Sequence, residues 1–325
     1  MNRRDVVTLF GIAVALPRAA FAQQKPLPVI GYFSARSAEA ETPLRTPFLA
    51  ALEQAGFATG RNVTIEYRFA EGRRDRLPML ATELVGLQPA VLVATEHGAA
   101  LAAKAATTTV PIVFTSGYDS VQAGLVASLN RPGGNATGIN LFTSELGPKR
   151  LALLRELLPE PGTIAVLIDR NSPSGPVQIE DVQTAARAIG QPILLLQVRN
   201  AEETEAAFAT MAERRVTGLL YGASTLFQGI ADRLVALAAS QRLPALYEWR
   251  DFVIAGGLIS YSTSRTEIGR QLGEYAGRIL KGAAPADLPV VQSVRFELVI
   301  NLKTAKALGL DLPASVLARA DEMIE

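Results

Sequence analysis

Short apolar runs alternate with amphipathic segments through most of this chain. The runs that predict strands are VIGYFS (29–34), NVTIEYRF (62–69), AVLVATE (90–96), residues 110–116, residues 135–140, TIAVLID (163–169), ILLLQV (193–198), GLLYGA (218–223), PALYEW (244–249), GLISYS (257–262) and FELVIN (296–301). The segments between them carry apolar residues at helical spacing, as in Leu44, Phe48 and Leu52. Regular strand–helix alternation predicts an α/β protein with right-handed crossovers and parallel sheets.

The alternation restarts after Asn140, which predicts two doubly wound parallel-sheet lobes joined by a hinge. Ser264-Arg265-Thr266-Glu267 is a capping box that opens a helix expected over 264–281, and we predict that this helix recrosses onto the first lobe. The predicted lobes are 28–140 with about 263–285, and 141–262 with about 286–325. Two lobes joined by several crossings enclose a cleft.

The stretch from 111 to 140 connects this fold to a candidate site. Its first strand ends in the small polar residues of 115–119, a short helix is expected near 121–129, and a further strand ends at Asn140. Ligands of open parallel sheets bind just beyond the carboxyl ends of the strands. The sequence therefore predicts part of a binding rim at 115–119.

The first 22 residues form a separate segment. Arg3-Arg4 precede an apolar run over 6–16, and Ala20-Phe21-Ala22 fits a small-x-small cleavage pattern. We interpret residues 1–22 as a signal peptide cut before Gln23, with a buried or disordered N-terminal helix as the alternative. The expected location is the periplasm. The arginine pair suggests the twin-arginine route, and the general secretion route stays open.

Composition and charge exclude several classes of function. Hydrophobic residues make up 49% of the chain and charged residues 19%, which is typical of a globular protein. Basic and acidic residues number 32 and 31, so no net attraction to nucleic acid is expected. There is no cysteine, which excludes disulfides, thiolate metal sites and a cysteine nucleophile. His97 is the only histidine, and no GxSxG or phosphate-loop pattern is present, so we expect no catalytic residue, metal or cofactor.

Three motifs resemble those of a known family. They are RPGGNATG (131–138), PADLPV (285–290) and FELVINLKTAKALGLDLPASVLARADEMIE (296–325). They resemble the periplasmic substrate-binding proteins of ABC transporters with the type I fold, in the large bacterial family that includes tryptophan- and tyrosine-binding members. The resemblance spans essentially the whole mature chain. It implies a protein, expected to be monomeric, that captures a small molecule and delivers it to a membrane permease.

A protein that binds its ligand in a cleft needs polar side chains at strand ends to orient the ligand and aromatic rings to cover it. The candidates in the first lobe are Ser34, Thr95, Glu96, Ser116, Tyr118 and Asp119. Those in the second lobe are Asn171, Tyr221, Ser224 and Glu248. Asn140 and Tyr261 lie where the chain is predicted to cross between the lobes.

Each candidate has a structural alternative. Ser34, Ser116 and Asp119 also suit helix caps, and Thr95-Glu96 suits an N-terminal capping pair. The tyrosines suit stacking on a ring-bearing ligand and equally suit packing within the hinge. Asp169-Arg170-Asn171 also suits a simple strand end.

The leading hypothesis is a solute-binding protein whose lobes close on a small molecule. The resemblance implies an amino acid or another small carboxylate as the ligand. A zwitterion would need an acidic partner for its ammonium group, and the candidates are Glu96, Asp119 and Glu248. A clamshell sensor that signals to a membrane receptor is an alternative that the sequence does not separate from uptake. An enzyme on the same scaffold is a third hypothesis, which the absence of a nucleophile turn disfavours.

Overall fold

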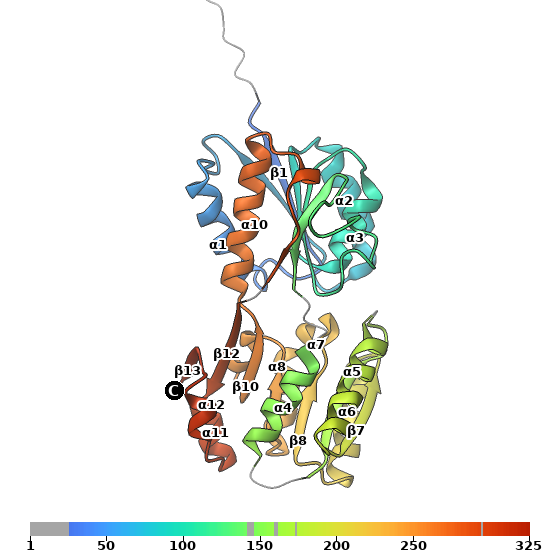
Figure 1. The fold of residues 1–325 in the computed structure, drawn as a ribbon, viewed down its shortest axis with the longest axis vertical. Helices are drawn as coiled ribbons and strands as arrows, with labels where there is room; N and C mark the ends of the chain where they lie inside the picture. The colour runs from blue at the N-terminus through green and yellow to red at the C-terminus, as the bar shows by residue number, and fades with distance from the viewer. Residues whose placement is uncertain (1–25, 142–145, 159–161, 173, 294) are drawn as a thin grey trace, which may run out of the picture.

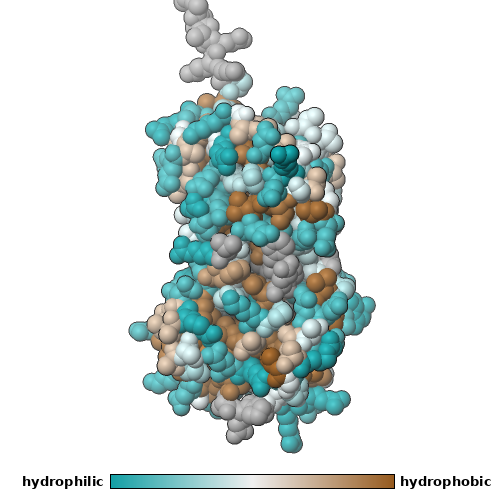
Figure 2. All heavy atoms as spheres, in the orientation of Figure 1, coloured by the Kyte–Doolittle hydropathy of each residue, from teal (hydrophilic) through white to brown (hydrophobic). Residues whose placement is uncertain are grey.

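The fold consists of two α/β lobes stacked along the long axis of the molecule (Figure 1). A computed structural model describes residues 26–141, 146–158, 162–172, 174–293 and 295–325. The expected signal peptide at 1–22 lies outside these residues. No helix of the described ranges is both long enough and apolar enough to cross a bilayer. Figure 2 shows one continuous, elongated body with hydrophilic residues over much of the face in view.

The first lobe contains a six-stranded sheet in the order β11-β5-β4-β3-β1-β2, and every described pairing in it is parallel. Its strands are β1 (Val29–Ser34), β2 (Thr64–Phe69), β3 (Val91–Ala94), β4 (Ile112–Ser116), β5 (Ala136–Asn140) and β11 (Val291–Gln292). Its helices are α1 (Thr42–Gln54), α2 (Leu77–Gly86), α3 (His97–Ala106) and α10 (Arg265–Leu280), with 3₁₀ turns at Arg74–Arg76 and Pro285–Asp287. Helices α1 and α10 cover one face of the sheet, and α2 and α3 cover the other (Figure 1).

The second lobe contains a seven-stranded sheet in the order β13-β12-β10-β9-β8-β6-β7. Its strands are β6 (Ile164–Asp169), β7 (Ile193–Val198), β8 (Gly218–Tyr221), β9 (Ala245–Tyr247), β10 (Ile259–Thr263), β12 (Phe296–Asn301) and β13 (Glu322–Ile324). Its helices are α4 (Gly147–Leu157), α5 (Gly175–Ala188), α6 (Ala201–Glu213), α7 (Thr225–Gly229), α8 (Ala231–Ser240), α9 (Arg250–Ile254), α11 (Leu302–Leu308) and α12 (Ala314–Leu317). The sheet is parallel except where β10 meets β12.

Helix α10 follows a strand of the second lobe but packs on α1 of the first lobe. Ser264 caps it, with its Oγ accepting a hydrogen bond from the Glu267 N–H at 3.3 Å. Gly269, Gly273 and Gly277 lie one turn apart on the side that faces α1. Their lack of side chains lets the two helix backbones approach closely, which fixes α10 on the first lobe.

Two short segments differ from the sequence prediction. Residues 121–129 form turns rather than a helix, because Asp119 caps only the first turn and Gly124 adopts a positive φ of 70°. Strand β11 pairs with β5 of the first sheet, with Val291 opposite Ile139. The last crossing to the second lobe therefore follows Gln292, later in the chain than the expected boundary near residue 286.

Candidate functional site

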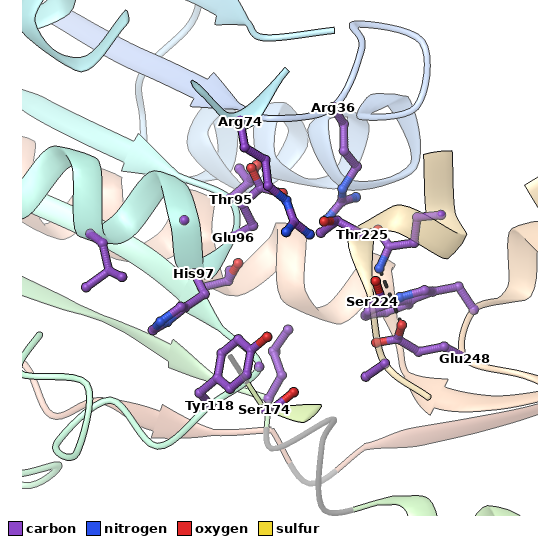
Figure 3. A pocket seen from close by; sticks show the side chains of 18 of the residues that line it. Arg36, Arg74, Thr95, Glu96, His97, Tyr118, Ser174, Ser224, Thr225 and Glu248 are labelled. Carbon is purple, nitrogen blue, oxygen red and sulfur yellow. Dashed lines mark hydrogen bonds between the residues drawn. The ribbon is translucent and has the colours of Figure 1, made fainter. Parts of the chain in front are cut away.

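A cavity of about 260 Å³ lies between the lobes, where the carboxyl ends of strands from both sheets face each other. The first lobe contributes the loops after β1, β3 and β4 and the turn before α2, and the second lobe contributes those after β6, β8 and β9. The volume lies just below the usual range for small-molecule sites, roughly 300–1,000 Å³, which favours a ligand of small size. We call this space the ligand cavity (Figure 3).

Two carboxyl groups approach the ligand cavity from opposite lobes. Glu96 follows β3, and its Oε1 accepts a hydrogen bond from the Ala35 N–H. Glu248 follows β9 and is almost fully buried, with Gln228 Nε2 3.4 Å from its Oε2. Burial raises the pKa of both carboxyls above the ordinary value, against the opposing effects of Arg36 on Glu96 and Arg150 on Glu248. A cationic group of a ligand placed near them would favour their ionised forms.

Two guanidinium groups from the first lobe, those of Arg36 and Arg74, lie near Glu96. Figure 3 shows the side chains of Arg36 and Arg74 extending into the cleft. Arg36 Nη1 lies 3.2 Å from Oε1 of the buried Glu41, which also accepts hydrogen bonds from the hydroxyls of Tyr32 (2.8 Å) and Ser34 (3.0 Å). Desolvation would lower the pKa of Arg36, but its carboxylate neighbours outweigh this effect and raise it. Arg36 therefore stays charged.

Aromatic rings line the ligand cavity and reach across the cleft. The Tyr118 ring lies 4.4 Å from that of His97 between centroids, and its hydroxyl lies 3.2 Å from Ser172 Oγ of the second lobe. Burial lowers the pKa of His97, which favours the neutral imidazole near pH 7. On the other side, Trp249 carries the Arg265 guanidinium 4.6 Å above its ring. These rings provide flat apolar surface for a ring-bearing ligand.

Several buried polar atoms of the cavity wall have no hydrogen-bond partner in the described part of the chain. They are Thr95 Oγ1, Glu96 Oε2, Thr225 Oγ1, Gln228 Oε1, Trp249 Nε1 and Arg36 Nε. Buried polar groups in folded proteins nearly always have a partner, which here would be water or a ligand. The set contains both donors and acceptors, and therefore suits a polar molecule that carries both.

Half of the candidates chosen from the sequence line the ligand cavity. They are Thr95, Glu96, Tyr118, Asn171, Ser224 and Glu248. Ser224 also caps α7 and donates to Asp169 Oδ2 at 2.6 Å, a structural role that the sequence analysis did not consider for it. Contact with a ligand stays a prediction for all six.

Three other candidates lie directly behind the cavity wall. Ser34 bonds to Glu41, while Ser116 Oγ donates to the Tyr118 carbonyl (2.9 Å) and lies 3.0 Å from His97 Nδ1. Asn140 is fully buried. When its side-chain NH₂ group points toward the neighbouring carbonyl groups, it donates hydrogen bonds to the carbonyls of Ser116 and Tyr118. These residues hold the wall in place, and they do not line the ligand cavity.

The remaining three candidates lie away from the ligand cavity. Asp119 Oδ1 accepts the N–H groups of Val121 (2.8 Å) and Gln122 (3.2 Å), which is the capping role that its position also allowed. Tyr221 is buried in the second lobe, stacked on Tyr247 with centroids 5.0 Å apart. Tyr261 stacks on Phe296 instead and lines a separate pocket of that lobe.

The sequence analysis missed the cationic side of the site. Arg36 lies two residues beyond the end of β1, as close to its strand as the chosen Asn171 is to β6, so strand-end position could have indicated it. Arg74 lies five residues beyond the end of β2, further than any chosen candidate lies from its strand. Gln228 lies one turn beyond Ser224, on helix α7. It reaches the cleft because that turn places it on the side of the helix that lines the ligand cavity. His97 and Trp249 directly follow the candidates Glu96 and Glu248, so rim position is a signal that could have found them.

A family model described as ABC transporter substrate binding protein matches residues 37–324. The chain belongs to this family. Membership confirms the resemblance stated from the three sequence motifs, and it concerns solute-binding proteins rather than enzymes. A curated relative, the tyrosine-binding protein of Clostridioides difficile (strain R20291), is 26% identical over 263 residues, which are 81% of this chain and 75% of that protein.

Solved structures confirm the predicted fold class, two α/β lobes of the periplasmic-binding type. A conserved domain protein from Vibrio cholerae O1 biovar El Tor matches with a TM-score of 0.82 and 26% identity, covering 91% of this chain and 99% of that one. An ABC domain from Streptococcus pneumoniae in complex with L-Trp also has a TM-score of 0.82, at 24% identity, covering 92% and 100%. A ligand-free, open substrate-binding protein from Clostridium difficile has a TM-score of 0.70 at 25% identity, covering 92% and 99%.

Proposed function

We propose that this family member captures a small zwitterion, foremost an aromatic amino acid, between its lobes in the periplasm and presents it to a membrane permease for import. The observation that carries the proposal is the ligand cavity, where carboxyl groups, guanidinium groups and aromatic rings from two lobes surround unpartnered polar atoms. Family membership supports the transporter role, and the tyrosine-binding relative supports the ligand class.

Closure of the lobes is the proposed mechanism. Tyr118 contacts Ser172 across the cleft, and Arg265 at the start of α10 lies 2.6 Å from Asp251 of the second lobe. A ligand that touches both walls adds further contacts that exist only when the lobes are closed. It can shift the equilibrium toward closure only by its difference in affinity for the two states.

A thermal-shift and calorimetry screen tests this proposal. The mature chain from Gln23 onward would be titrated with L-tyrosine, L-tryptophan and L-phenylalanine, with L-alanine and L-lysine as controls. A ligand present at 100 times its Kd stabilises the folded form by about 2.7 kcal/mol, so the aromatic amino acids should raise the melting temperature. The proposed ligand class fails if none of the three aromatic amino acids binds.

The pH dependence of binding should follow Glu96 and Glu248. Burial raises the pKa values of both carboxyls. At acidic pH their neutral forms therefore stabilise the ligand-free protein. This contribution to stability is lost as the pH rises through the raised pKa values. An ammonium group prefers the ionised forms. The affinity for L-tyrosine should therefore fall as the pH decreases from 7 through these pKa values, with protons released on binding. Calorimetry in buffers of different ionisation enthalpy measures both effects, and a pH-independent affinity would contradict this assignment.

A further inference from the structure

A second cavity of about 320 Å³ adjoins the ligand cavity. The two share four lining residues, namely Arg36, Arg74, Thr225 and Gln228. The second cavity is also lined by Arg265 at the start of α10 and by Asp251 of the second lobe. We call it the arginine cavity. The two spaces therefore adjoin at these four side chains, and Arg36 and Arg74 can contact a ligand from either space.

The two cavities differ in the charges that line them. Glu96 and Glu248 line the ligand cavity and are absent from the wall of the arginine cavity. Arg265 lines only the arginine cavity, while Arg36 and Arg74 line both. Three guanidinium groups face two carboxylates, Glu71 and Asp251, in the arginine cavity, whereas two guanidinium groups face two carboxylates in the ligand cavity. The excess of cations therefore lies in the arginine cavity.

The guanidinium groups of the arginine cavity retain unused donors. The Nε and Nη1 atoms of Arg36 and Arg265 are buried and make no well-aligned hydrogen bond within the described residues. Each guanidinium nevertheless has a carboxylate nearby, which is Glu41 for Arg36 and Asp251 for Arg265. Burial is the main cause that lowers the pKa of Arg265 to about 10, and the positive charge of the nearby Arg36 is the second. These two cations therefore repel each other, and an anion between them would relieve that repulsion.

Arg74 is the most accessible of the three cations. It begins the 3₁₀ turn before α2, and its guanidinium makes no ion pair or hydrogen bond with the described part of the chain. Figure 3 shows its side chain extending into the cleft. Guanidinium groups bind carboxylates through paired, charge-assisted hydrogen bonds.

We infer that the arginine cavity is an anion subsite that takes the carboxylate of the ligand, with the ammonium group directed back toward Glu96 and Glu248. The inference rests on the proposed function and makes it more specific. It makes the carboxylate a requirement, so that aromatic amines are rejected, and it makes Arg74 a specificity-determining residue.

The test compares L-tyrosine with tyramine, which lacks the carboxylate, for the wild-type protein and for Arg74→Gln. Arg74→Gln should weaken L-tyrosine binding about 10- to 100-fold, the effect of losing a hydrogen-bonded charge. It should leave the weak binding of tyramine unchanged. Arg73→Gln is the matched control, because Arg73 is an exposed neighbour that pairs with Asp75 and lines neither cavity. Equal affinities of the wild type for L-tyrosine and tyramine, or equal losses of both in Arg74→Gln, would overturn the subsite.

A separate titration distinguishes failure of the subsite from failure of the proposed function. If no aromatic amino acid binds, the proposed ligand class is wrong, and sodium malonate at constant ionic strength then tests the subsite directly. Malonate should raise the melting temperature of the wild type and of Arg73→Gln but not of Arg74→Gln. An equal shift in all three proteins, or no shift in any, would overturn the anion subsite.

Discussion

Glu96→Gln is expected to weaken L-tyrosine binding about 10- to 100-fold at pH 7, because the substitution removes the charge opposite the ammonium group while keeping the shape of the side chain. The melting temperature of the ligand-free protein should not fall. Burial raises the pKa of Glu96, which means that the ionised carboxylate is costly in the folded state and a neutral isostere removes that cost. Isothermal calorimetry and thermal unfolding measure the two effects separately.

Asp119→Asn is the matched control for Glu96→Gln. Asp119 is also a rim carboxylate of the first lobe, but it caps residues 121 and 122 and does not line the ligand cavity. Asparagine keeps the capping oxygen, so the affinity for L-tyrosine should stay at the wild-type value. Unchanged affinity in Glu96→Gln, or an equal loss in both variants, would show that Glu96 does not face the ammonium group.

Gly273→Val should destabilise the protein by about 3 kcal/mol or more. A Cβ at this position would overlap the Phe48 carbonyl oxygen and lie 2.8 Å from the Ala51 Cβ, and valine adds two further methyl groups. Overfilling a close-packed contact typically costs about 1–3 kcal/mol, and here the obstacle is helix backbone that cannot rotate away. Urea unfolding followed by circular dichroism measures the change.

Gly86→Val separates this packing effect from helix propensity. Gly86 is also a helical glycine, at the end of α2, and a Cβ there would meet nothing within 4 Å. Valine forms helices better than glycine, so this variant should be as stable as the wild type or slightly more stable. If both variants were destabilised equally, the close approach of α10 to α1 would not explain the loss.

Local sequence patterns predicted the parts of the fold that depend on local physics. Continuous apolar runs indicated the central strands, and the capping box at Ser264 marked the start of α10. Strand β11 was not predictable in this way, because two residues of a parallel edge strand carry no periodicity and are placed by the neighbouring β5. The helix expected over 121–129 failed because Gly124 takes a left-handed conformation that ends the first turn.

The site was predictable where a side chain directly follows a strand. Glu96 and Glu248 follow the buried strands β3 and β9 and reach the ligand cavity. Tyr221 is the last residue of β8, and the parity of that strand turns its ring into the core rather than toward the cleft. Arg36 and Arg74 depend on the path of two loops, which hydrophobic periodicity does not describe.

The first sheet gains its edge strand from residues close to the end of the chain, since β11 and α10 both follow the second lobe's β10. During synthesis, the N-terminal 140 residues must therefore wait for nearly all of the remaining polypeptide before their own packing is complete. Contacts between such distant parts of a sequence form slowly. The newly made chain consequently spends an extended interval with an incomplete first lobe.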